Sequence, residues 1–286
     1  MIFFVLSGFF IHKSLVRSVS ERRLSDFVVS RVNRIVPPFA FAIALTVALW
    51  AIAPMAFGGD RSLDSPIRSE FSISGIWVTA VFLNGLFGPT VSANGPLWSL
   101  SYEIWYYTLA LLFALIVLGK RGGWVFIPAL LILSFYEPRF LILGFVWMFG
   151  FVVSILHSNK RLPDLSHWPF LILAIIALVL YIQIGPSQES PFYVFEIALG
   201  AWFSVYLTEI VQREPGSFAP FTANFSYSLY VTHFPLLLFM RGAQVQWWVA
   251  VPTIAAAFIC IGPWIERLRV VPSARSRQST SSAVKA

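Results

Sequence analysis

One short polar motif could place a carboxylate inside an apolar segment, and it reads Asn94-Gly-Pro-Leu-Trp-Ser-Leu-Ser-Tyr-Glu103. Asn94 or Ser99 can cap the helix that Pro96 starts. On that helix Ser99 and Glu103 are i, i+4 neighbours, as are Trp98 and Tyr102. An ionisable residue among apolar ones is a functional candidate. We predict Glu103 as catalytic, in acid–base or substrate-orienting work, with Trp98, Ser99 and Tyr102 lining a substrate channel; the alternative is an interfacial carboxylate in contact with water.

A second motif, Phe225-Ser-Tyr-Ser-Leu-Tyr-Val-Thr-His233, puts polar groups on an otherwise apolar helix. Ser226, Tyr230 and His233 fall within roughly 60° of one another at 100° per residue. His233 could act as a general base or donate to a carbonyl oxygen. We predict catalytic roles for His233 and Tyr230 and a channel role for Ser226. The alternative is a structural histidine bonded between helices.

A third candidate is the basic segment 13–36, where residues 24–36 read as a helix. Its apolar face is formed by Leu24, Phe27, Val28, Val32 and Ile35, and its opposite face by Asp26, Ser30 and Asn33. Arg31 falls inside the apolar face and Arg34 borders it. Guanidinium groups bind phosphate oxygens in a bidentate manner. We predict that Arg31 and Arg34 bind the phosphates of a cytoplasmic donor; the alternative is contact with lipid phosphates.

The elements that carry these motifs must lie in a membrane. The 286 residues are 58% hydrophobic and 12% charged, whereas soluble domains are roughly 25% charged. Apolar blocks such as 39–57, 100–118, 140–156 and 170–184 approach the ~20 residues that span a bilayer. The single cysteine, Cys260, excludes a disulfide framework, and no metal site is predicted. The net charge of +7 indicates basic cytoplasmic loops and not a nucleic-acid partner.

The distribution of positive charge predicts the topology. If residues 74–87 are re-entrant or interfacial, all but four of the 20 Lys and Arg lie on one side of the membrane. The positive-inside rule makes that side, with the C-terminus, cytoplasmic. The fold class is therefore an all-α transmembrane bundle of about nine spans. They are residues 1–12 (partial), 38–57, 99–118, 124–136, 139–157, 168–185, 191–211, 225–241 and 246–265.

The two ends of the chain differ in character. Residues 1–11 read as the end of a membrane helix that stops at His12 and Lys13, and they are too short to span a bilayer. We predict a membrane domain over residues 1–266. Residues 267–286 are basic, small and polar, and are predicted to form a disordered cytoplasmic tail.

Four motifs in order resemble those of the acyltransferase-3 membrane family, the O-antigen and Nod-factor O-acetylase type. Residues 3–11 resemble its FFVLSG(F/Y)LI segment, and Arg31-Val-Asn-Arg34-Ile-Val-Pro37 resembles its RxxRIxP motif. Trp98-Ser-Leu-Ser-Tyr-Glu103 is similar to WSLxxE, and Ser226 to His233 match SYxxYxxH. The resemblance implies ten transmembrane helices with a catalytic histidine on the first. That first family helix has no counterpart here, so we expect the chain to lack it.

The resemblance implies an O-acyltransferase that moves an acyl group from acyl-CoA, a co-substrate and not a bound cofactor, to a hydroxyl group. The expected donor is acetyl-CoA, and the expected acceptor is a glycan or a lipid-linked sugar. The expected location is the bacterial inner membrane. The alternatives are a glycan or lipid exporter without enzymatic activity and an inactive truncated relative.

Overall fold

The structure is a computed structural model that describes residues 2–57, 73–159 and 225–271, with scattered residues between 169 and 206. Within these residues the secondary structure is helical, with no strand beyond an isolated bridge between Asn84 and Gly88. The α-helices are α1 (Ile2–Ser20), α2 (Leu24–Phe57), α3 (Ile73–Ala80), α4 (Leu97–Val117), α5 (Phe126–Tyr136), α6 (Pro138–Ser158), α10 (Ser226–Gly242) and α11 (Trp247–Arg267). Two 3-10 helices, η1 (Ser92–Asn94) and η2 (Arg121–Val125), complete the set.

Four of these helices, α2, α4, α6 and α11, are long and apolar enough to cross a membrane. The predicted all-α membrane bundle is confirmed for the described residues. The predicted spans 168–185 and 191–211 lie outside the residues that the structure describes continuously. The short predicted span 124–136 corresponds to η2 and α5, whose sixteen residues rise about 26 Å together.

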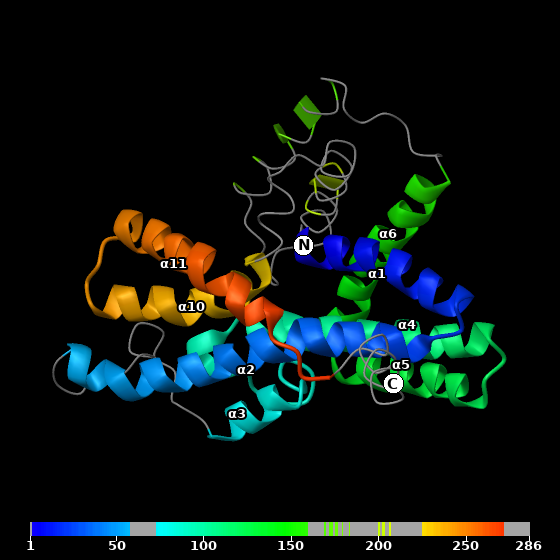
Figure 1. Cartoon of the computed structure of the whole chain (residues 1–286), viewed down its shortest axis with the longest axis horizontal. Coiled ribbons are helices and arrows are strands. Elements are labelled where there is room, and N and C mark those ends of the chain that lie inside the picture. The colour runs from blue at the N-terminus through cyan, green and yellow to red at the C-terminus, as the bar shows by residue number, and fades with distance from the viewer. Residues whose placement is uncertain are drawn as a thin grey trace, which may run out of the picture. The chain divides into compact units, whose positions relative to one another are not determined.

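The chain divides into two compact units, one formed by residues 1–23 and 105–219, the other by residues 24–104 and 220–286. In the first unit α1 packs against α6 (Figure 1). The two helices cross at glycines: a Cβ on Gly8 would overlap the Trp147 carbonyl, and one on Gly150 would overlap the Val5 carbonyl. The segment that resembles FFVLSG therefore serves as a close helix–helix contact.

The prediction that the first helix stops at His12 and Lys13 is wrong, because α1 continues to Ser20. Both polar side chains find partners without breaking the helix. His12 Nδ1 lies 2.9 Å from Ser154 Oγ of α6, and Lys13 Nζ lies 4.9 Å from the centre of the Phe9 ring.

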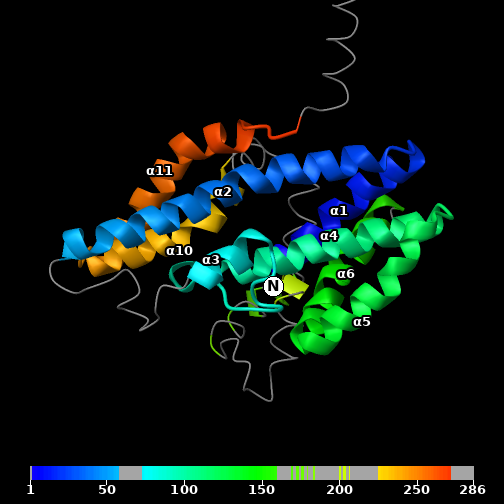
Figure 2. The same ribbon diagram turned by 90° about the horizontal axis from the view of Figure 1, so that it is seen from below.

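In the second unit α2, α10 and α11 lie side by side, as the two views in Figure 1 and Figure 2 show. The sequence predicts separate helices over 24–36 and 38–57, but the structure has one helix of 34 residues. Pro37 and Pro38 each remove one backbone donor. They are consecutive and buried, so the loss stays within one turn, as membrane helices tolerate. At 1.5 Å per residue α2 is about 51 Å long and exceeds the ~30 Å hydrocarbon core.

Residues 73–96 form the support on which α4 begins. The eight residues of α3 rise only about 12 Å, so α3 by itself cannot cross a bilayer. Gly85 has φ +73°, a conformation that favours glycine, and the chain turns back there. Ser101 of α4 hydrogen-bonds Asn84, whose side chain also reaches Thr90 at 3.3 Å. These polar contacts hold the segment against the first turns of α4.

Candidate functional site

The candidate site starts at the first turns of α4, where Ser99 and Glu103 share a face. Each is only 5% exposed. Neither predicted cap is formed in the described structure: the Ser99 hydroxyl donates to the Pro96 carbonyl at 2.8 Å, and Asn94 reaches across to another helix. The apolar residues on either side of Glu103 continue the helix. Because Glu103 is so little exposed, its carboxyl group is enclosed by protein.

The Ser99 hydroxyl is hydrogen-bonded to the Tyr230 hydroxyl, 131 residues away on α10. A serine hydroxyl has one proton, and Ser99 gives it to the Pro96 carbonyl. Tyr230 is therefore the donor in the bond to Ser99. Glu103 follows Ser99 by one turn on the same face of α4 and is buried like it. Two of the three candidate motifs thus meet at one place.

Asn94 makes a second link between these motifs. Its Nδ2 donates to the Val231 carbonyl at 2.9 Å and to Thr46 Oγ1 of α2 at 3.2 Å. In a helix the Val231 carbonyl would accept from residue 235, but Pro235 has no N–H. Asn94 is fully buried, so it satisfies a carbonyl that would otherwise be costly. Sequence reasoning missed this role of Asn94. The signal in the sequence is Pro235, because a proline within a helix leaves the carbonyl four residues earlier without its backbone donor.

His233 lies one turn after Tyr230 on α10 and is half-buried. Its Nδ1 is 2.6 Å from the Tyr230 backbone carbonyl oxygen. A carbonyl oxygen only accepts, so the proton of the neutral ring lies on Nδ1 and the lone pair on Nε2. The rings of Tyr230 and His233 are 6.0 Å apart, centre to centre. Ser226, the third member of the predicted stripe, is exposed in the first turn of α10.

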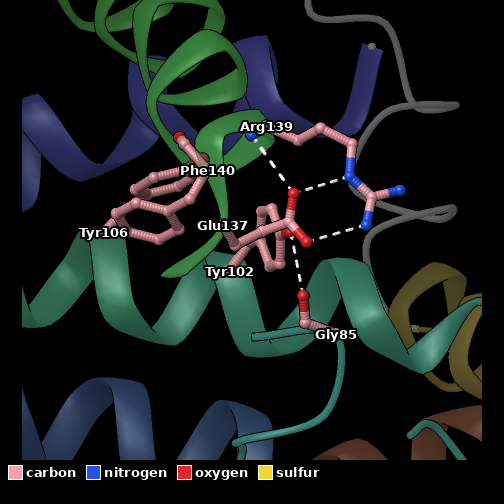
Figure 3. Close-up of polar contacts among 6 residues, drawn as sticks. All are labelled: Gly85, Tyr102, Tyr106, Glu137, Arg139 and Phe140. Carbon is pink, nitrogen blue, oxygen red and sulfur yellow. Dashed lines mark hydrogen bonds and ion pairs between the residues drawn. The ribbon is translucent and has the colours of Figure 1, made fainter. Parts of the chain in front are cut away.

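Trp98 and Tyr102 have different surroundings. Tyr102 is almost completely buried, and its hydroxyl donates to the Gly85 carbonyl at 3.0 Å (Figure 3). Trp98 is 37% exposed, and its ring meets that of Tyr102 edge-on at 5.1 Å. Tyr102 therefore fastens the Gly85 turn to α4, and Trp98 presents an open aromatic face.

Arg31 and Arg34 lie toward the N-terminal end of α2. Arg34 is exposed, and Arg31 is half-buried with its guanidinium carbon 5.7 Å from the centre of the Phe27 ring. Thr46, which contacts Asn94, follows Arg31 by 15 residues and Arg34 by 12, a rise of about 22 and 18 Å along the helix. The two arginines thus belong to the same unit as Tyr230. They lie well away, along α2, from Thr46, the point where Asn94 joins α2 to α10.

Asn33, which the sequence places opposite the apolar face of this helix, is covered by another segment of the chain. Asn33 is 5% exposed, and its amide is bonded to the backbone of residues 270 and 271. Periodicity alone treats an asparagine as solvated, because the segment that covers it lies 237 residues away in the chain.

Long apolar helices with a buried carboxyl, a tyrosine and a histidine on neighbouring elements describe an integral membrane protein with acid–base groups in its interior. The sequence profile of the acyltransferase-3 family, described as an acyltransferase domain, matches residues 1–266. The chain belongs to this family and is a membrane acyltransferase. No curated protein and no solved structure matches the chain significantly.

Proposed function

We propose that the protein transfers an acyl group, in the first instance acetyl, from cytoplasmic acyl-CoA to a hydroxyl group of a glycan or a lipid-linked sugar. The observation that carries the proposal is the bond between Ser99 and Tyr230, one helical turn from the buried Glu103. It brings proton-handling groups from two distant motifs together in a partly buried place. Buried, preorganised donors are effective because water is excluded.

The reaction is an exchange at one carbonyl carbon. The acceptor oxygen attacks the thioester carbonyl, the carbon–sulfur bond breaks, an ester forms, and coenzyme A leaves as the thiol with one proton. His233 has its lone pair on Nε2, since Nδ1 donates to the Tyr230 carbonyl, and can take the acceptor proton. Glu103 orients the acceptor hydroxyl. Tyr230 donates to the developing oxyanion in place of Ser99.

The separation along α2 favours a donor with a long arm. Arg31 and Arg34 lie about 18 to 22 Å from Thr46 along the helix, and Thr46 contacts the residue that joins α2 to α10. Coenzyme A carries its phosphates at one end and its thioester at the end of an extended pantetheine arm. With the phosphates on the arginines, the thioester can lie near Tyr230. Trp98, Ser99, Tyr102 and Ser226 remain the proposed channel residues.

The orientation that fits this proposal has the arginine end of α2 and the C-terminus in the cytoplasm of a bacterial inner membrane. A reporter fused near residue 90 should then lie outside and one at residue 120 inside. The reverse result at either position contradicts the topology.

The proposed reaction is tested with the full chain in lipid nanodiscs, labelled acetyl-CoA and membrane glycan as acceptor. Glu103→Gln should abolish incorporation, and Arg31→Ala should raise the apparent KM for acetyl-CoA about tenfold. Glu21→Gln is the control, because Glu21 pairs with Arg17 on an exposed surface. Unchanged incorporation by Glu103→Gln would reject its role. Wild-type protein that transfers no label while still moving glycan would instead indicate an exporter.

A further inference from the structure

The segment that follows α11 is fastened to α2 by the single buried side chain of Asn33. Its Nδ2 donates to the Val271 carbonyl at 2.7 Å. Its Oδ1 accepts from the backbone N–H of Val270 at 2.9 Å and of Val271 at 2.8 Å. A primary amide offers two donors and an oxygen that accepts twice. Backbone groups of two adjacent residues, Val270 and Val271, use three of these four possibilities, so the contact fixes the register of the segment.

This contact brings arginines from two elements to one place. Arg34 directly follows Asn33, and Arg31 precedes it by two residues. On the other element Arg269 directly precedes Val270, and Arg267 is the last residue of α11. Leu268 leaves the helix in an extended conformation, with φ −59° and ψ 140°. The four side chains therefore start from positions within a few residues of the Asn33 contact.

The charges of three of these arginines are available to a ligand. Arg34, Arg267 and Arg269 are exposed, and none forms an ion pair with another residue that the structure describes. The acidic neighbour Glu266 is engaged elsewhere, since its Oε1 accepts from the Ser228 backbone N–H at 3.0 Å. The surface around Asn33 thus carries an excess of positive charge with unused guanidinium donors.

We propose that Arg267 and Arg269, held in place by Asn33, form the second half of a phosphate-binding site whose first half is Arg31 and Arg34. The inference rests on the proposed function, because its ligand is the phosphate end of the acyl donor. Coenzyme A carries a diphosphate and a separate ribose phosphate. Guanidinium groups approaching from two elements can bind such a group from two sides. Asn33 is a positioning residue that acts through the segment it holds.

Lipid headgroups offer the same phosphate chemistry, so the test must separate the two sources. The full chain is placed in nanodiscs of phosphatidylcholine alone or with added phosphatidylglycerol, and the Kd of coenzyme A is measured by calorimetry. R267Q/R269Q should raise this Kd at least about tenfold in both bilayers. Arg241→Gln should leave it unchanged, because Arg241 is an exposed arginine in the last turn of α10. A Kd unaltered by R267Q/R269Q, together with loss of bound phosphatidylglycerol, would assign the arginines to lipid and overturn the inference.

The role of Asn33 is tested by combining variants. Asn33→Ser should weaken coenzyme A binding by a factor similar to that of R267Q/R269Q. The variant that carries all three substitutions should bind only slightly more weakly than either, because both changes act through one segment. Factors that multiply would show that Asn33 does not act through these arginines. If Asn33→Ser does not fold, the comparison of R267Q/R269Q with Arg241→Gln still decides on the arginines.

Two patterns distinguish the inference from the function on which it rests. Coenzyme A binding that is lost in Arg31→Ala but kept in R267Q/R269Q rejects the inference alone. A wild-type chain that binds no coenzyme A in either bilayer rejects both.

Discussion

Asn94 donates a hydrogen bond to the Val231 carbonyl at 2.9 Å. Within α10 this carbonyl would accept from the N–H of residue 235, but that residue is a proline and has no N–H. Asn94, the last residue of η1, thus replaces a bond that α10 itself lacks. The same pair of segments is joined again where Ser99 meets Tyr230. One buried and one partly buried bond therefore set how the start of α4 and the first half of α10 lie relative to each other.

Asn94→Ala should lower the stability of the protein by about 1–3 kcal/mol, because it leaves the buried Val231 carbonyl without its partner. Pro235→Ala restores a backbone N–H four residues after Val231 and lets α10 satisfy that carbonyl itself. Asn94→Ala should therefore cost less in the Pro235→Ala background than in the wild type. The measurement is the apparent Tm of the detergent-solubilised chain, followed by tryptophan fluorescence.

Thr46→Val serves as the comparison for this cycle. It removes the other acceptor of the Asn94 amide and leaves the Val231 carbonyl bonded, so its effect should be independent of residue 235. Equal costs of Asn94→Ala in both backgrounds would show that Pro235 is not the reason for the Asn94 contact.

Tyr230→Phe should lower kcat for acyl transfer by about 10²-fold, as the loss of one oxyanion donor does in other enzymes, with little change in KM. Ser99→Ala should have a smaller effect on kcat, since it removes the partner of the Tyr230 hydroxyl and not its proton. Tyr136→Phe is the matched control, because Tyr136 is exposed at the end of α5. A wild-type kcat in Tyr230→Phe would contradict its proposed contact with the thioester carbonyl.

The sequence alone predicts the helices and the grouping of polar residues on them, because both depend on local properties. Apolar length defines α4, α6 and α11. The i, i+4 spacing places Ser99 and Glu103 on one face, where both are buried. Charge counting also treats residues 74–87 as non-crossing, and the eight-residue α3, which overlaps them, is too short to span a bilayer by itself.

The contacts made by the two asparagines could not be predicted, because their partners are distant in the chain. Asn33 meets residue 270, and Asn94 meets residue 231. A polar residue has several ways to be satisfied, and neither periodicity nor hydropathy chooses among them. For the same reason the continuation of α1 beyond Lys13 could not be predicted without the Ser154 partner of His12.

Glu137 should make stability depend on pH in the acid range. It lies between α5 and α6, where its carboxylate accepts two bonds from the Arg139 guanidinium, at 2.7 and 2.8 Å (Figure 3). The Arg139 side chain lowers the pKa of Glu137 below its ordinary value of 4.5, although burial opposes the shift. A lowered pKa in the folded state means that the stabilisation is complete above pH 4.5 and is lost as the pH falls through the folded pKa.

The apparent Tm of Glu137→Gln should therefore lie below that of the wild type at pH 7, and the difference should shrink as the pH falls below 4.5. Glu21→Gln is the comparison: its partner Arg17 is mostly exposed, and such pairs add little stability at any pH. A Tm difference for Glu137→Gln that stays constant from pH 7 to about pH 3 would rule out ionisation of Glu137 as its cause.

His233 can be tested by separating its two ring nitrogens. Asparagine places an N–H donor near the position of Nδ1, so His233→Asn should keep the bond to the Tyr230 carbonyl and the wild-type Tm. The asparagine side chain has no counterpart of Nε2. Loss of this general base should lower kcat by about 10²- to 10⁴-fold. A structural histidine would give the opposite pattern: near wild-type turnover in His233→Asn, and a lowered Tm in His233→Ala, which cannot donate to that carbonyl.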